Sequence, residues 1–236
     1  MRASWNIRLV LGLVTLGGCV DRQEKRLDER QEETEVAMVD HSQDALAMRQ
    51  ALVKGQREEA MAALDRLRAR LPLKVLSPKG HLAQKEFITA VNLAATSPDL
   101  PSLAQSYGAM LQACGECHRS TGVRVEVALP APAAPDSPTV ARMAVHGQAS
   151  QAMVMALVAA DEPAFVQAAA ILREASLVPD GLDPSGTLPP MAIETGVRLG
   201  DLAAQAGSAE GRHGELMGEI LSTCASCHSL AGRGGG

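Results

Sequence analysis

Four of the five cysteines in this 236-residue chain belong to two copies of the pattern Cys-x-x-Cys-His. This pattern is typical of covalent haem c attachment. Two thiols three positions apart lie on one helical turn and reach the two vinyl groups of one porphyrin edge, while the imidazole of the next residue lies under the ring and ligates the iron. We therefore expect two haem c groups attached to Cys114, Cys117, Cys224 and Cys227, with His118 and His228 as the proximal iron ligands.

Two other uses of paired cysteines compete with haem. A four-cysteine zinc site would have to bring both pairs together, and the usual gap of about 15–20 residues between such pairs is absent here. Redox-active cysteine pairs belong to a βαβ context that this chain lacks, and they need no histidine after each pair. Zinc is therefore the main alternative to haem.

The chain is a tandem repeat built around the two motifs. Residues 38–43 match residues 143–148 at an offset of 105, and near the motifs the offset is 110. Four prolines within residues 129–138 predict an extended, semi-rigid linker between the copies. We expect five segments: a leader (1–18), a polar tether (19–34), a first haem domain (35–122), a linker (123–137) and a second haem domain (138–236).

Proline and glycine positions divide each copy into four predicted helices. In the first copy these are residues 35–53, 56–70, 80–96 and 102–118, with Gly55 as a stop signal and Ser102 with Gln105 as a capping box. In the second copy they are 139–159, 161–176, 189–206 and 209–228. Short connections favour an all-α fold of two up-down-up-down four-helix bundles, each with its haem motif at the C-terminal end.

The composition agrees with helices around a bulky cofactor. Aromatic residues make up only 2% of the chain, which argues against an all-β fold. Large aromatics normally supply much of the volume of a core. A haem in each copy would supply that missing volume.

One histidine recurs on an apolar helical face in each copy. His41 and His146 both lie near the start of the first predicted helix, on stripes that continue through Met48 and Met153. In an up-down-up-down bundle this end lies beside the end of the fourth helix, so both are candidate distal iron ligands. His81, or a methionine of the stripe such as Met38 or Met143, remains an alternative ligand, although we interpret the methionines as core packing.

The N-terminus has the features of an export signal. Arg2 and Arg8 precede a short apolar run over residues 9–16, which is too short to span a bilayer. The run ends in Leu-Gly-Gly-Cys19, which resembles the lipobox of bacterial lipoproteins, in which the cysteine is lipidated. The resemblance implies a chain anchored through Cys19 on the periplasmic side of a bacterial membrane. Ordinary secretion, with Cys19 incidental, is the alternative.

The two pentapeptides and the helical repeat together resemble multihaem c-type cytochromes of the cytochrome c prime class, over residues 35–120 and 138–233. The resemblance implies covalent haem, a proximal histidine after each cysteine pair, and a periplasmic role in redox chemistry or gas binding. The copies are shorter than that family's domains, and each places a histidine where the family has an apolar residue or methionine. This second difference argues against an open distal face.

Electron transfer is the function that these features favour. Bis-histidine ligation leaves no open site on the iron, so the chain would pass electrons to a redox partner of unknown identity. A haem-based NO or CO binding protein is the alternative, and we do not expect an enzyme. The net charge of −5, which becomes more negative when the leader is removed, gives no basic footprint for nucleic acid.

Overall fold

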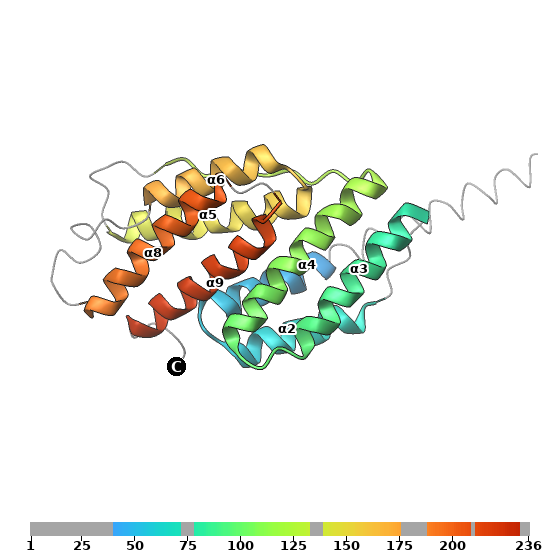
Figure 1. Cartoon of the computed structure of the whole chain (residues 1–236), viewed down its shortest axis with the longest axis horizontal. Helices are drawn as coiled ribbons and strands as arrows, with labels where there is room; N and C mark the ends of the chain where they lie inside the picture. The colour runs from blue at the N-terminus through green and yellow to red at the C-terminus, as the bar shows by residue number, and fades with distance from the viewer. Residues whose placement is uncertain (1–39, 72–77, 133–138, 176–187, 209–210, 232–236) are drawn as a thin grey trace, which may run out of the picture. The chain divides into compact units, whose positions relative to one another are not determined.

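Every regular element in the part of the chain that the structure describes is an α-helix (Figure 1). The structure is a computed structural model that describes residues 40–71, 78–132, 139–175, 188–208 and 211–231. Cys19, the predicted leader and tether, Met38, and residues 133–138 of the predicted linker lie outside these ranges. No helix of the described ranges has the length and apolar content needed to cross a membrane.

The helices occur where the repeat predicts them. In the first copy they are residues 40–53, α2 (Arg57–Ala69), α3 (Pro78–Ala95) and α4 (Leu100–Thr121). In the second copy they are α5 (Thr139–Ala159), α6 (Glu162–Ala175), α8 (Pro190–Ala206) and α9 (His213–Leu230). The prediction of an all-α fold is therefore confirmed for the described residues.

Contacts between Cα atoms divide the chain into two compact units, Met1–Ser42 and Gln43–Gly236. Residues 40–42 are the described part of the first unit. The second unit contains helices from both sequence copies, and their buried side chains form one hydrophobic cluster. Met48 and Met153 of the two predicted stripes are fully buried in this cluster, as expected for packing residues.

The first helix of each copy ends in the same left-handed turn. Gly55, the predicted stop, has a φ of +74°, and Ala160 at the corresponding position has a φ of +53°. In both turns the amide of the next residue, Gln56 or Asp161, donates to a helix carbonyl at 2.9 Å. A left-handed conformation is favourable for glycine and costs an L-residue about 1–2 kcal/mol, so the second copy retains this turn under strain.

The start of α4 corrects one prediction. The helix begins at Leu100 with Asp99 as its N-cap, rather than at a capping box formed by Ser102. The Asp99 carboxylate accepts a hydrogen bond from the Ser102 amide at 2.8 Å. Pro101 is tolerated in the first turn because amides there have no partner within the helix. The prediction treated this proline as a helix breaker and therefore placed the start too late.

The two helices that carry the Cys-x-x-Cys-His motifs, α4 and α9, pack against each other (Figure 1), and glycines lie at their contact. A methyl group added to Gly108 of α4 would meet the carbonyl of Gly214 on α9, and one added to Gly218 would lie 2.9 Å from the carbonyl oxygen of Ala104. Gly108 faces Gly214, whereas Ala104, which comes earlier on α4, faces Gly218, which comes later on α9. The two helices therefore run antiparallel. At the repeat offset of 110 these two contacts are equivalent, which is the signature of a two-fold pseudo-symmetric interface.

Packing inside the second copy connects all four of its helices. α5 packs against α6, α6 against α8, and α8 against α9, while α9 makes a smaller contact with α5. Between the copies, α4 packs against both α5 and α9. The two cysteine motifs are therefore positioned by helices of both copies.

Candidate haem sites

The first motif occupies the last two turns of α4. Cys114 and His118 are 8% and 9% exposed, while Cys117 is half-buried. The helix ends directly after the motif, because Gly122 adopts a φ of +75° and its amide donates to the His118 carbonyl. The motif therefore lies at a helix end and presents two of its three functional side chains to the interior.

The second motif occupies the equivalent turns of α9. Cys224 is 3% exposed, and Cys227 and His228 are half-buried. The Cys227 thiol lies 3.9 Å from the carbonyl oxygen of Ala192 at the start of α8. The thiols of both motifs are free, and the structure does not join either pair as a disulfide.

His146 lies beside the second motif, where the up-down-up-down order predicts it. Its Nε2 atom is 4.0 Å from Sγ of Cys224, although the two residues are 78 positions apart in the sequence. The charge of His228 contributes to lowering the pKa of His146, so all three side chains occupy one region. The side chain of His146 is buried. The start of α5 and the end of α9 thus bring together the residues predicted to hold the second haem.

His41, the predicted equivalent of His146, is also buried. It belongs to the unit Met1–Ser42, whereas His118 belongs to the unit Gln43–Gly236. The assignment of His41 to the first haem remains a sequence prediction.

Burial favours the neutral forms of His118, His146, Cys114 and Cys224. Desolvation is the largest influence on His146 and lowers its pKa to about 4, with the charges of His228 and Arg49 acting in the same direction. Desolvation also lowers the pKa of His118, partly opposed by a hydrogen bond to the Val158 carbonyl. Burial raises the pKa of Cys114 and Cys224 to about 12. A neutral imidazole is the form that can ligate iron.

Two of these histidines carry a buried ring atom that has no hydrogen-bond partner. Nδ1 of His118 and Nδ1 of His146 are both enclosed and unpaired. Buried polar atoms in native proteins are almost always satisfied, so an orphan of this kind suits a site whose ligand is not part of the polypeptide. The residues present therefore fit a haem, which the cysteine thiols and histidines of each site would hold and which would supply one-electron chemistry.

The two cysteine pairs do not form a joint site. Across the described ranges, no three side chains of histidine, cysteine, aspartate or glutamate come together as ligands of one metal ion. The antiparallel crossing of α4 and α9 directs their C-terminal ends away from each other, which separates the pairs. The described geometry does not provide the four-cysteine arrangement that the zinc alternative requires.

Helix α5 extends from one motif to the other. His146 near its start contacts Cys224, and Leu157 near its end contacts the first motif, where a methyl group added to Gly115 would meet the Leu157 carbonyl. Eleven residues separate these positions, which corresponds to about 16 Å of helix. The reciprocal contact also exists, since a methyl group on Gly55 would lie 3.8 Å from the carbonyl oxygen of Ala225 in the second motif.

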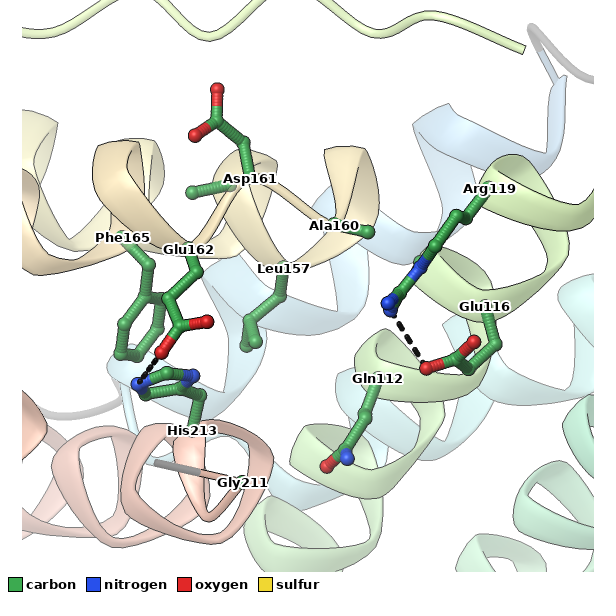
Figure 2. Close-up of a pocket in the computed structure, with 12 residues that line it drawn as sticks. Gln112, Glu116, Arg119, Leu157, Ala160, Asp161, Glu162, Phe165, Gly211 and His213 are labelled. Carbon is green, nitrogen blue, oxygen red and sulfur yellow. Dashed lines mark hydrogen bonds and ion pairs between the residues drawn. The ribbon is translucent and has the colours of Figure 1, made fainter. Parts of the chain in front are cut away.

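The alternative ligands His81 and Met143 are not core residues, and one further histidine, His213, lines a cavity together with Gly115 and Glu116 of the first motif. His81 is exposed on α3, and Met143 is half-buried on α5. His213 packs against Phe165 with ring centroids 4.5 Å apart. It lines a cavity of about 260 Å³ between α4, the α5–α6 turn and the start of α9 (Figure 2), and no cysteine lines that cavity.

Arg49 is the residue near the second site that sequence analysis missed. Its guanidinium donates hydrogen bonds to the carbonyl of Gly147 and the hydroxyl of Ser150, at 3.0 and 2.9 Å. It comes from the first copy but lies against the second. In the sequence, Arg49 is only a charged residue that follows Met48 of the apolar stripe. That pattern does not distinguish an arginine that acts on the site from one that is exposed to solvent.

Comparison of the chain with protein-family models, with curated protein sequences and with solved structures gives no match.

Proposed function

We propose that this protein is an electron-transfer protein with two covalently attached haem c groups, one on each Cys-x-x-Cys-His motif. The observation that carries the proposal is the position of His146, whose Nε2 lies 4.0 Å from Cys224 Sγ. The motif alone predicts attachment and one axial ligand. A second buried histidine beside it supplies what a low-spin, six-coordinate iron requires.

Each copy contributes one set of residues to this function. The cysteine thiols form thioether bonds and fix the porphyrin edge to α4 or α9, and His118 and His228 act as proximal ligands. His146 acts as the distal ligand of the second haem, and His41 has the same role in the first. When bound, the haem iron supplies one-electron chemistry. Each copy folds as a four-helix bundle around its haem, which provides the bulk that the few aromatic residues do not.

Attachment is tested by the mass of the intact protein purified from a host with active cytochrome c maturation. The wild type should carry two haems, and the double variants Cys114→Ala/Cys117→Ala and Cys224→Ala/Cys227→Ala should each carry one. Neither double variant should affect attachment to the other motif, so each serves as the control for its counterpart. A wild-type protein with the mass of the bare polypeptide would refute the proposal.

Axial ligation is tested by visible spectroscopy of the same protein. We expect low-spin spectra in both oxidation states and no response to CO. His146→Ala should convert one of the two haems to high spin and open it to CO, whereas His213→Ala and His81→Ala should leave both low-spin. High-spin iron and rapid CO binding in the wild type would instead support the gas-binding alternative.

We also propose export and lipid anchoring through Cys19, which rest on the sequence of residues 1–19. Covalent haem c attachment requires a compartment outside the cytoplasm, so the two proposals support each other. Cys19→Ala should move the protein from the membrane fraction to the soluble fraction while both haems remain attached. Retention of that variant in the membrane fraction would contradict the anchor.

A further inference from the structure

Arg49 places a positive charge beside the second site, and no carboxylate of the described residues pairs with it. Its side chain reaches from the 40–53 helix to α5, where it donates to Gly147 and Ser150. Ser150 lies one turn after His146 on α5. None of the ion pairs recorded for the described residues includes Arg49. The cation is therefore held in place by neutral oxygens, and its charge is not cancelled locally.

The charge acts on the second site and is only partly screened by bulk water. Arg49 is half-buried, and this burial is the largest influence on its guanidinium and lowers its pKa. The same charge lowers the pKa of His146 and opposes the rise in the pKa of Cys224. Electrostatic interactions of partly buried charges are several times stronger than those at the surface.

The repeat does not provide the first site with an equivalent cation. At the offset of 105 that relates the first helices of the two copies, the counterpart of Arg49 is Val154, which is buried and uncharged. Tyr107, a fully buried side chain whose hydroxyl donates to the Ala45 carbonyl at 2.9 Å, interacts electrostatically with both Arg49 and Cys114 of the first motif. The pseudo-symmetry of the two copies is thus broken at this position by a charge that lies on the side of the second motif.

We propose that Arg49 raises the reduction potential of the second haem above that of the first, so that an electron on the chain resides at the Cys224–Cys227 site. This inference rests on the proposed function. Reduction from ferric to ferrous iron adds one electron and no proton, so the site loses one unit of positive charge. Arg49 disfavours the ferric state more than the ferrous state. The electron gained at the second site leaves the first site, whose iron is oxidised from ferrous to ferric.

The experiment is a spectroelectrochemical titration of the haem-loaded protein. The two midpoints are assigned with the single-haem double variants described above. Arg49→Gln should reduce the redox equilibrium constant of the second site by about tenfold, which is a fall of about 59 mV in its midpoint for one electron. The first site should change much less. Arg49→Lys, which keeps the charge, should preserve most of the difference between the sites.

The matched control is Arg68→Gln, because Arg68 is an exposed residue of α2. It removes the same charge from the surface, where salt screens it, and should move neither midpoint. Equal shifts of both midpoints in Arg49→Gln, a shift of the first midpoint alone, or no shift would overturn the inference. Should Arg49→Gln lose its haem, Arg49→Met carries the same test with a similar side-chain length. Failure of the proposed function would differ, because the wild type would then show no haem midpoints.

Discussion

Replacement of Gly108 by alanine tests the glycine crossing that positions both haem motifs. The added Cβ would overlap the Gly214 carbonyl oxygen and would lie 2.9 Å from the Gly214 carbonyl carbon and 3.1 Å from the Gly218 nitrogen. These atoms belong to backbone, so they cannot rotate away, and α4 and α9 must separate. Overpacking of this kind costs about 1–3 kcal/mol. The higher helix propensity of alanine offsets about 1 kcal/mol of this cost.

We therefore expect Gly108→Ala to reduce the free energy of unfolding by up to about 2 kcal/mol, after the propensity gain is subtracted. For a chain of this size the melting temperature should fall by about 2–4 °C for each kcal/mol. Gly147→Ala on α5 is the control, because nothing lies within 4 Å of the added methyl group. That variant should gain up to about 1 kcal/mol from helix propensity alone.

The assay is thermal and denaturant unfolding of the protein purified from a host with active cytochrome c maturation, followed by helix circular dichroism, a signal to which every regular element of the described residues contributes. The two glycine variants should change stability in opposite directions. If Gly108→Ala were as stable as Gly147→Ala, the α4–α9 crossing would not be as close as described, and the pseudo-symmetric interface would have to be abandoned.

Two further stability predictions follow from differences between the copies. Ala160→Gly should relieve its left-handed strain and stabilise the protein by about 0.5–1 kcal/mol, whereas Gly55→Ala should destabilise it by a similar amount; changes of equal sign in denaturant melts would contradict this. Asp44 is a buried carboxylate bound at 2.8 Å by the partly exposed Arg66 of α2 and by Arg70 at the C-cap of that helix, so Asp44→Ala should cost about 1–3 kcal/mol. In the second copy the counterparts of Asp44, Arg66 and Arg70 are the buried residues Ala149, Ile171 and Ala175. The triple variant Asp44→Ala/Arg66→Ile/Arg70→Ala should therefore recover most of the lost stability in the same melts.

The positions of the helices follow from local signals that act over a few residues. Gly55 ends the first helix because its φ of +74° costs glycine nothing, and the offset of 105 places Ala160 in the same turn. The error at α4 is also local, since Asp99 rather than Ser102 provides the cap. Pro101 is compatible with the first turn of the helix, but in a sequence a proline usually indicates a helix break, so the start was predicted too late.

The motifs and their repeat are properties of the sequence, because covalent attachment requires two thiols and an imidazole at fixed spacing within one helical turn. The stripe that carries His146 is likewise readable, since a period of 3.6 residues defines its apolar face. Only tertiary structure decides that α4 and α9 cross through glycine and that Arg49 of one copy lies beside the second motif of the other. Such placements depend on how helices pack across distances of about 100 residues in sequence, and local spacing carries no information about them.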